Sequence, residues 1–233
     1  MPNFLELKIQ LTKFQMKLTY AICVCNESKD LYSLLSFLFK VKDNEDEVNV
    51  CVDTEHVTTT VLRVLDYFEE RVTVCKRAFD GRFATHRNWH FSQCSGDYIF
   101  YIDPDEMPQE LLIQNLKRLI LETKADLVCV PRINIHPGST QEWLERRFFQ
   151  VNDMGWINWP DMQARVFRRC PEIKMSHELH ERFEGAEKVI QFQPNPKLAL
   201  WHIKSVEKQD NRWEQDGTYR MPKDKTNLYD SLM

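Results

Sequence analysis

The chain has 233 residues, and its 42% of hydrophobic and 28% of charged residues are ordinary for a globular protein with one well-packed core. Its formal net charge of -4 argues against a general nucleic-acid-binding protein, because such a protein needs a basic surface that releases counterions from phosphate. The sequence has no apolar stretch long enough to cross a bilayer and no signal-peptide core at its start, so we expect a cytoplasmic protein without a transmembrane segment.

Strands and helices are predicted to alternate from residue 20 to residue 130. Residues 20–24 read as a buried strand, and Ser28 is placed to cap a helix whose leucines recur at helical spacing. Further strands are expected at 48–53, 71–75, 98–102 and 126–130, separated by helices that begin near residues 57, 83 and 109. Such alternation is typical of parallel strands with helices on both faces of the sheet.

The pattern changes near residue 131. From there the chain carries most of its tryptophans, a short amphipathic stretch at 141–150 and two strand-like runs, KVIQF and LALWHI. We expect this second half to be mixed structure laid over the end of the sheet, in the same domain. Residues 1–16 are an N-terminal extension that reads either as a strand with alternating apolar residues or as a dispensable segment.

The seven cysteines make an odd count. Five of them lie inside apolar runs, as reduced core thiols do: Cys23, Cys51, Cys75, Cys94 and Cys129. We therefore expect thiols rather than disulfides.

Polar and acidic residues follow the predicted strands. They are Cys25, Asn26 and Glu27 after the first strand, Asp53 and Glu55 after the second, and Asp103, Asp105 and Glu106 after the fourth, in SGDYIFYIDPDEMP. Ligands of open parallel sheets bind at these carboxyl ends. Crowded carboxylates repel one another unless a cation neutralises them, so we predict a divalent metal there. Oxygen ligands favour Mg²⁺ or Mn²⁺ over zinc, although a solvated acidic turn is the alternative.

Four segments, taken together and in order, resemble the family 2 nucleotide-sugar glycosyltransferases with the GT-A fold. They are ICVCNESKDLYSLLSFL, VNVCVD, FDGRFATHRN and GDYIFYIDPDE, and the resemblance covers nearly the whole chain from about residue 17. A fifth segment, WPDMQARVFRR at 159–169, is similar to one in bacterial lipopolysaccharide-core members. The compact single domain is also similar to the capsid-glycan transferases of chlorella viruses, and for a viral enzyme the cytoplasm would be that of the host.

The resemblance implies a single α/β domain in which a mostly parallel central sheet is flanked by helices. Residues 17–130 would form the nucleotide-sugar-binding half and residues 131–233 the acceptor-binding half. Two departures from the family pattern leave the base selectivity open: Cys25 stands where Tyr is usual, and Asp53 stands where two adjacent Asp are usual. The stereochemistry, inverting or retaining, stays open too.

The resemblance also implies roles for individual residues. For the nucleotide they are Asp53 at the base and ribose, Cys23, Cys25 and Asn26 at the pocket floor, and Arg82 and Arg87 beside it. Asp103 and Asp105 would hold Mn²⁺ or Mg²⁺ against the donor diphosphate, and His202 would complete that site. Asp161 would be the general base, with Glu178 or Glu181 as its replacement.

The chemistry of glycosyl transfer requires residues of these types. Negative charge grows on the diphosphate as the glycosidic bond breaks, so a hard cation stabilises the transition state more than the ground state. The acceptor hydroxyl must lose a proton, which requires a carboxylate or His on the opposite side of the sugar. Asp161 fits this role, although it could instead cap a strand or helix.

Acceptor-binding residues are expected in the second half of the chain. The candidates are Trp156, Trp159, Gln163, Arg165 and His177. An aromatic ring covers the apolar face of a sugar well, although core packing explains most tryptophans. The segment HELHE at 177–181 does not predict a zinc protease, because its histidines are three residues apart rather than four.

These observations predict a metal-dependent transferase that moves a sugar from a nucleoside diphosphate, UDP in the first place, to a hydroxyl of a glycan or glycoprotein. One alternative is a sugar-1-phosphate nucleotidylyltransferase, but that class needs a Gly-rich phosphate loop and CVCNESKD has no Gly. The other is a catalytically silent carbohydrate-binding or scaffold domain. Loss of Asp103, Asp105 or Asp161 would have favoured it, and all three are present.

Overall fold

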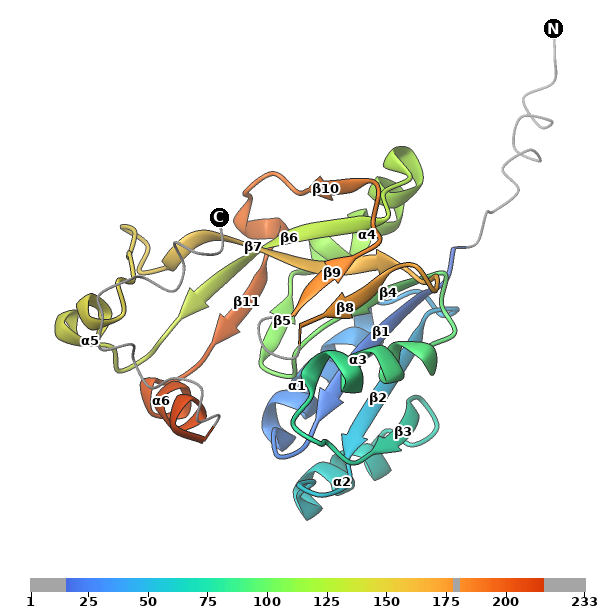
Figure 1. The fold of residues 1–233 in the computed structure, drawn as a ribbon, viewed down its shortest axis with the longest axis horizontal. Helices are drawn as coiled ribbons and strands as arrows, with labels where there is room; N and C mark the ends of the chain where they lie inside the picture. Colours follow the sequence, from blue (N-terminus) through green and yellow to red (C-terminus); the bar gives the residue numbers. More distant parts are fainter. Residues whose placement is uncertain (1–15, 178–180, 216–233) are drawn as a thin grey trace, which may run out of the picture.

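The computed structural model describes residues 16–177 and 181–215. Figure 1 shows the elements, which in chain order are β1 (Leu18–Val24), α1 (Ser28–Val41), β2 (Glu47–Asp53), α2 (Thr59–Tyr67), β3 (Thr73–Arg77), α3 (Phe83–Ser92), β4 (Tyr98–Tyr101), β5 (Glu106–Pro108), α4 (Glu110–Thr123), β6 (Leu127–Ile135), α5 (Gln141–Arg146), β7 (Ile157–Arg168), β8 (Lys174–Ser176), β9 (Arg182–Glu184), β10 (Val189–Gln191), η1 (Pro196–Leu198), β11 (Leu200–Ile203) and α6 (Val206–Gln215).

Within the described residues, nine strands form one mixed sheet in the order β3-β2-β1-β4-β7-β6-β11-β5, with β10 beside β6. The first four strands of this order are parallel to one another. β7 lies antiparallel between β4 and β6, and so joins strands of the first half of the chain to strands of the second. The prediction of a single α/β domain with a mostly parallel central sheet is confirmed.

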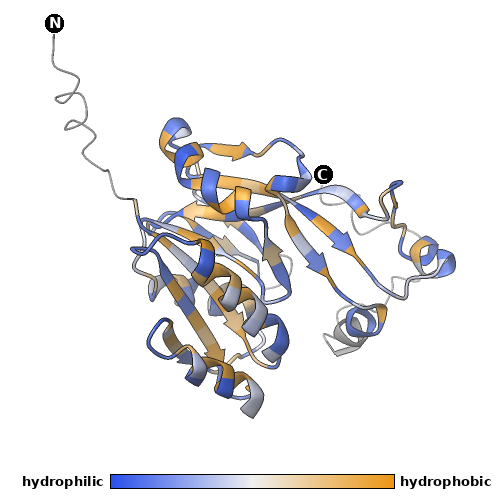
Figure 2. Cartoon of the chain, turned by 180° about the vertical axis from the view of Figure 1, so that it is seen from behind, coloured by the Kyte–Doolittle hydropathy of each residue, from blue (hydrophilic) through white to orange (hydrophobic). Residues whose placement is uncertain are grey.

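The two faces of the sheet bury separate hydrophobic clusters. Helices α1, α2 and α4 pack on one face and contribute to the larger cluster, whereas α3 and the β8–β9 hairpin cover the other face. Successive residues of a strand point to opposite faces. On β1, Tyr20 and Ile22 therefore belong to the larger cluster and Ala21 to the smaller one. Figure 2 shows the hydrophobic colour concentrated in the strands of the sheet, with hydrophilic residues at loops and helix ends.

The predicted strands and helices of the first half are present, but the predicted cap of the first helix is wrong. Ser28 is the first residue of α1, and the N-cap position belongs to Glu27. The Glu27 carboxylate accepts hydrogen bonds from the backbone N–H groups of Cys25 and Asn26, both at 3.0 Å. A carboxylate that binds backbone N–H groups before a helix holds the β1–α1 turn in place at the edge of the sheet.

The second half shares the sheet rather than covering its end. β6, β7 and β11 are members of the same sheet, and the division at residue 130 stays a prediction. Residues 1–15 of the predicted extension lie outside the described residues, while Met16 is buried in the larger cluster. Among the described residues, none of the helices is long and apolar enough to span a membrane.

Candidate active site

A cleft of about 680 Å³ opens at the carboxyl ends of β1, β2 and β4. Its lining comes from the β1–α1 turn, the end of β2, the start of α3, the segment after β4 and the start of α6: Cys23, Val24, Cys25, Asn26, Glu27, Asp53, His56, Phe79, Phe83, His86, Arg87, Asp103, Pro104, Asp105, Lys204, Ser205, Glu207 and Lys208. This is the edge at which ligands of open α/β sheets bind. The structure therefore brings together most of the residues predicted to contact the donor.

Asp53 is held at the end of β2 by hydrogen bonds to both carboxylate oxygens. Oδ1 accepts from the backbone N–H groups of Glu55 at 3.1 Å and Phe79 at 3.0 Å, while Oδ2 lies 2.7 Å from Nδ1 of His56. Burial acts to raise the pKa of Asp53, but these hydrogen bonds outweigh it and lower the pKa. The side chain of His56 is 65% exposed, so a ligand could displace it from Asp53.

Asp103 is surrounded by protein donors on both oxygens. Oδ2 accepts from Arg165 at 3.0 Å, and Oδ1 accepts from the Tyr101 hydroxyl and, at 3.4 Å, from Arg87. Burial acts to raise the pKa of Asp103, but the guanidinium groups of Arg165 and Arg87 hold it well below its usual range. Asp103 is thus an ionised carboxylate already neutralised by the protein.

Asp105 faces cationic groups from the C-terminal part of the chain. Its Oδ2 lies 3.8 Å from Nε2 of His202 and 3.5 Å from Nζ of Lys208, a residue of α6. Burial acts to raise the pKa of Asp105, yet its contact with His202 and the charges of Lys208 and Lys204 hold the pKa well below its usual range. This carboxylate therefore stays ionised beside the cleft.

The orientation of His202 follows from the pairing of β11. This strand pairs antiparallel with β5 and parallel with β6, which places His202 between Glu106 and Asn134. Nδ2 of Asn134 donates to the Asp161 carboxylate at 2.8 Å, so Oδ1 of Asn134 faces His202 and accepts from its Nδ1 at 2.8 Å. With Nδ1 bonded to Asn134, Nε2 is the ring nitrogen that faces Asp105, 3.8 Å from its Oδ2.

Asp161 lies on β7 opposite Arg132 of β6. It accepts three hydrogen bonds, from Arg132 Nε at 2.9 Å, Asn134 at 2.8 Å and Gln163 Nε2 at 2.6 Å, and its Oδ2 also forms an ion pair with Arg132 Nη2 at 2.7 Å. Burial acts to raise its pKa, but the charge of Arg132 and these hydrogen bonds lower it. Asp161 is connected to Asp105 through Asn134 and His202.

Glu106 closes this network from the other side. Its side chain is fully buried, and Oε1 accepts from Arg132 at 2.8 Å and from Arg165 at 2.6 Å. Its Oε2 lies 3.3 Å from the backbone nitrogen of Asp103 and accepts from that N–H. Hydrogen bonds and ion pairs thus run from Asp103 through Arg165, Glu106, Arg132, Asp161, Asn134 and His202 to Asp105.

The two predicted nucleotide-binding arginines occupy different places. Arg87 lines the cleft, and its guanidinium donates to Glu181 at 2.8 Å and stacks 4.5 Å from the centre of the Tyr101 ring. Arg82 stands at the N-cap of α3 with an exposed side chain that pairs with Asp80 at 2.6 Å. Glu178, one of the replacement bases, lies outside the described residues.

The remaining donor candidates, Cys23, Cys25 and Asn26, line the cleft as predicted. Burial, followed by the nearby carboxylate of Glu27, raises the pKa of the Cys25 thiol to about 11. Cys25 is therefore a neutral thiol at physiological pH.

The acceptor candidates are distributed over β7 and the hairpin that follows it. Trp156 and Trp159 are half-buried and pack edge to face at 5.2 Å between ring centres. Gln163 orients Asp161, whereas Arg165 is only 6% exposed and pairs with Asp103 and Glu106. His177 is exposed with a positive φ of 63°. Of these five, the two tryptophans and His177 can reach a ligand without giving up a side-chain ion pair or hydrogen bond seen among the described residues.

The network includes residues that sequence reasoning did not select, namely Glu106 as a buried link, Arg132, Asn134 and Lys208. Arg132 and Asn134 alternate with apolar residues in RINI of β6, and this alternation could have indicated polar residues on one face of a strand.

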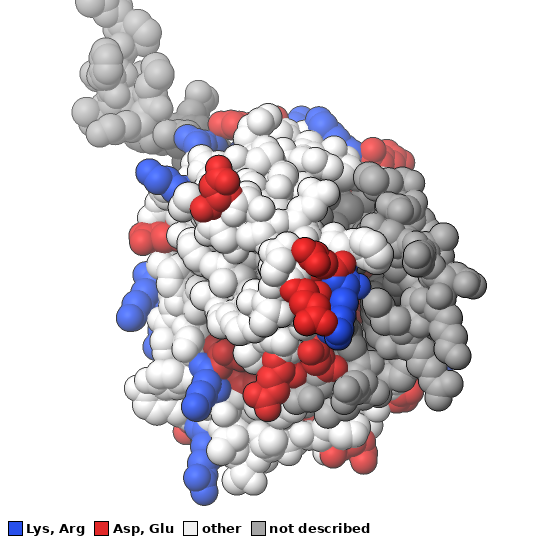
Figure 3. Space-filling model, turned by 90° about the vertical axis from the view of Figure 1, so that its left-hand side faces the viewer, with Lys and Arg blue, Asp and Glu red and all other residues white. Residues whose placement is uncertain are grey.

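Figure 3 shows one face of the molecule on which acidic side chains gather near the middle with basic side chains beside them.

A sequence profile described as glycosyl transferase family 2 matches residues 19–179. The chain belongs to this family. The family assignment makes it a glycosyltransferase and agrees with the position of the cleft at the carboxyl ends of the strands. A search of curated proteins found no match for this family 2 glycosyltransferase.

Solved structures support the GT-A fold of this family 2 member. The crystal structure of S. aureus TarS 1-349 in complex with UDP-GlcNAc is 17% identical with a TM-score of 0.57, over 81% of this chain and 59% of that chain. The complex of the same protein with UDP is 15% identical with a TM-score of 0.57, over 92% of this chain and 68% of that chain. The chain thus spans about three fifths of the length of the first of these structures.

Proposed function

We propose that this glycosyltransferase moves a sugar from a UDP-sugar to a hydroxyl of a glycan or glycoprotein, with the aid of Mn²⁺ or Mg²⁺. The observation that carries the proposal is the placement of Asp105 and His202 beside a cleft that Asp53 borders at the neighbouring strand end. The UDP and UDP-GlcNAc complexes of TarS, which shares the fold, support UDP as the nucleotide.

The residues around Asp105 fit a divalent cation. Asp105 supplies carboxylate oxygen, and His202 supplies an Nε2 lone pair whose direction is fixed by the hydrogen bond from its Nδ1 to Asn134. Such a second hydrogen bond is typical of metal-binding histidines. Asp103, the other proposed ligand, would have to exchange part of its contacts with Arg165 and Tyr101 for the ion. A bound Mn²⁺ or Mg²⁺ would offset the charge that develops on the leaving diphosphate.

The nucleotide would occupy the part of the cleft between β1 and β2. Oδ1 of Asp53 is held by backbone N–H groups, so this carboxylate has a fixed position. Its Oδ2 could exchange the exposed His56 for a ribose hydroxyl. Cys23, Cys25 and Asn26 would form the floor of this pocket, with Arg87 and, from the N-cap of α3, Arg82 against the nucleotide.

Asp161 is the proposed general base. Its pKa is lowered, so it is ionised at neutral pH and can accept a proton from the acceptor hydroxyl. Trp156 and Trp159 would bind the acceptor near it, with Gln163 and His177 at the margin. Arg165 would contribute by holding Asp103 rather than by touching the acceptor.

The test is ligand binding by thermal stabilisation and calorimetry, using UDP, GDP and CMP with and without Mn²⁺. A ligand at 100 times its Kd stabilises the folded state by about 2.7 kcal/mol, which raises the Tm of a chain of this size by roughly 5–10 °C. We expect UDP with Mn²⁺ to give such a shift. Asp105→Ala should lose the metal-dependent part of this shift, whereas Asp66→Ala, an exposed change on α2, should keep it.

Two results would contradict the proposal. If no nucleotide binds under any of these conditions, the cleft is not a donor site, and the protein is better described as a catalytically silent carbohydrate-binding or scaffold domain. If UDP binds equally with and without Mn²⁺ and Asp105→Ala has no effect, the enzyme does not use the metal we place at Asp105 and His202.

A further inference from the structure

Three cysteines form a row across the parallel strands β1, β2 and β3. Cys23 is the register partner of Cys51, and Cys51 is the register partner of Cys75. Register partners of neighbouring parallel strands point to the same face of a sheet. Val50 and Val52, on either side of Cys51, belong to the cluster on the α1 face, so the row of thiols faces α3.

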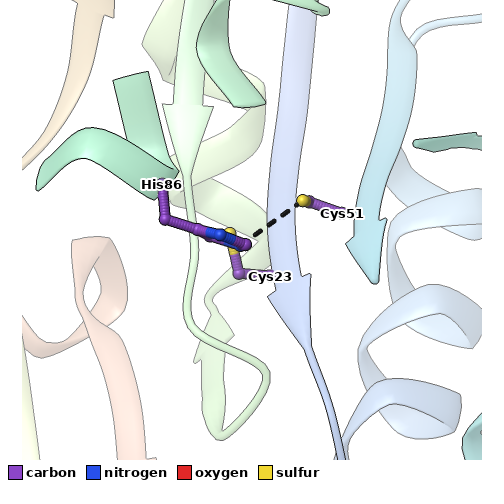
Figure 4. A group of neighbouring side chains, drawn as sticks. All are labelled: Cys23, Cys51 and His86. Carbon is purple, nitrogen blue, oxygen red and sulfur yellow. Dashed lines mark hydrogen bonds between the residues drawn. The ribbon is translucent and has the colours of Figure 1, made fainter. Parts of the chain in front are cut away.

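Helix α3 places two imidazoles over this row. His86 and His90 are four residues apart and therefore share one face of the helix. Nε2 of His86 lies 3.5 Å from Sγ of Cys51, and Nδ1 of His90 lies 3.3 Å from Sγ of Cys23. Figure 4 shows the His86 ring extending from α3 over the Cys23 thiol toward Cys51.

The spacing matches that of ligands around one tetrahedral ion. Bond lengths of about 2.3 Å to sulfur and 2.0–2.1 Å to nitrogen put the two ligand atoms about 3.5 Å apart at a tetrahedral angle. This is the distance between Cys51 Sγ and His86 Nε2. The ligand atoms of Cys23, Cys51 and His86 all lie within 4.8 Å of one another, and among the described residues this is the set of three that could hold a metal ion.

The surroundings of His90 resemble the outer shell of a metal site. Asn49 donates from Nδ2 to the backbone carbonyl of Gln93 at 3.1 Å, so its Oδ1 is an acceptor and faces Nε2 of His90 at 3.1 Å. The proton of neutral His90 is therefore on Nε2, and the lone pair of Nδ1 faces Cys23. Asn49, Cys51 and His90 have no exposed surface, so these orientations are fixed by packing.

The imidazole of His86 is buried beside these thiols. It is 6% exposed, and within the described part of the chain its Nδ1 has no hydrogen-bond partner, which is costly for a buried polar atom. Two buried thiols beside an imidazole nitrogen are good ligands for a soft cation.

We propose that Cys23, Cys51 and His86 bind one Zn²⁺ ion beneath the donor cleft, with a solvent ligand completing the tetrahedron and His90 beside Cys23 in the outer shell. Thiolate and imidazole ligands select zinc over Mg²⁺ or Mn²⁺, so this site differs in chemistry from the one at Asp105. The two thiols release their protons to solvent on binding. Because His86 precedes Arg87, and Cys23 lines the cleft, the ion fixes α3 and β1 at the floor of the donor site.

The experiment is a Co²⁺ titration of the metal-free full-length chain, followed by displacement with Zn²⁺. Co²⁺ reports on thiolate ligands through a charge-transfer band in the near ultraviolet and on tetrahedral geometry through strong visible bands. We expect one equivalent of Co²⁺ to develop both, and Zn²⁺ to abolish them. Cys51→Ser should weaken Zn²⁺ binding by at least about 100-fold, more than the loss of an outer-shell partner would.

Two controls and a pair of replacement variants make the result specific. Cys129→Ser removes a thiol on β6, away from the row, and should keep both bands. Asp105→Ala should keep them too, because a carboxylate site gives no thiolate band. If Cys51→Ser does not give a folded far-ultraviolet circular dichroism spectrum, Cys23→Ser and His86→Gln replace it.

The proposal is overturned if the wild type shows no thiolate band, or if the folded ligand variants bind Zn²⁺ as tightly as Cys129→Ser does. The experiment does not depend on donor binding, so it can succeed or fail independently of the proposed function.

Discussion

Asp161 is the residue whose chemistry the structure defines most sharply. We expect Asp161→Asn to lower kcat by about 10²–10⁴-fold, the contribution that general bases typically make. Nucleotide binding should be unchanged, because Asp161 is not among the residues that line the donor cleft. Released UDP measured against time gives the rate, and calorimetry gives the nucleotide affinity.

A matched control distinguishes the role of the Asp161 carboxylate from that of Gln163, which orients it. Gln163→Ala removes a donor to Asp161 Oδ1 but leaves the carboxylate, so the rate should fall by much less. An Asp161→Asn enzyme with full activity would rule out Asp161 as the base, and Glu181 would then become the next candidate.

Glu106 should matter for stability rather than for proton transfer. It is a fully buried carboxylate between two guanidinium groups, so Glu106→Gln leaves both Arg132 and Arg165 without their shared counter-charge. Breaking a buried ion pair in this way costs about 3–5 kcal/mol. Urea unfolding should show a loss of that size, whereas Glu122→Gln, on the exposed side of α4, should change it by less than about 0.5 kcal/mol.

Single residues were predictable from the sequence when they followed a recognisable strand end. Asp53, Asp103 and Asp105 belong to this class. Arg132 and Asn134 do not, because their role depends on which strand lies beside β6, and Asn134 owes its orientation to Asp161 on β7. The sequence also favoured reduced core thiols, but it could not show that Cys23, Cys51 and Cys75 stand in register.

At the scale of elements, α6 brings a competing cation to the predicted metal site. Nζ of Lys208 lies 3.5 Å from Asp105 and 2.9 Å from Asp30 of α1. A metal ion at Asp105 has to displace this ammonium group, so Lys208→Met should raise the affinity for Mn²⁺ by about two- to fivefold, the worth of a partly exposed ion pair. Calorimetric titration with Mn²⁺ alone measures this affinity. Lys197→Met, at an exposed lysine, is the control. Weaker Mn²⁺ binding in Lys208→Met would show that Lys208 supports the metal site.

Elements with a strong hydrophobic period were predictable, and elements defined by distant pairing were not. The central strands and α1, α2 and α4 follow from apolar runs and helical spacing. β7 contains most of the segment WPDMQARVFRR, and its place between β4 and β6 depends on long-range pairing that no local pattern encodes. β5 has three residues and exists because β11 pairs with it. Ser28 failed as a cap because Glu27, one residue earlier, binds the backbone N–H groups of the turn.

The whole molecule should lose stability in acid. Asp103, Asp105 and Asp161 have lowered pKa values in the folded state, because their cationic and hydrogen-bonding partners outweigh the effect of burial. An unfolded Asp titrates near about 3.9, so the unfolded chain takes up protons first as the pH falls. The stability from these groups is therefore fully present above about pH 5 and is lost progressively below pH 4.

Urea unfolding at pH 3, 4, 5 and 7 measures this dependence. Asp103→Asn should be less stable at pH 7 and should lose less stability between pH 5 and pH 3 than the wild type does. Equal slopes for the two proteins over this interval would show that Asp103 is not ionised against Arg165 in the folded state.

The position of β7 has a consequence for synthesis on the ribosome. The four residues of β4, Tyr98–Tyr101, are each at most 9% exposed. One edge of β4 pairs with β1, and the other pairs with β7, which begins at Ile157. At about 5–20 residues per second, roughly 3–11 s separate the two during translation. For that interval the nascent chain presents an apolar open edge, which is where unfolded chains associate. Expression of this enzyme should therefore depend on chaperones that bind nascent chains, and truncations that end before Ile157 should be insoluble.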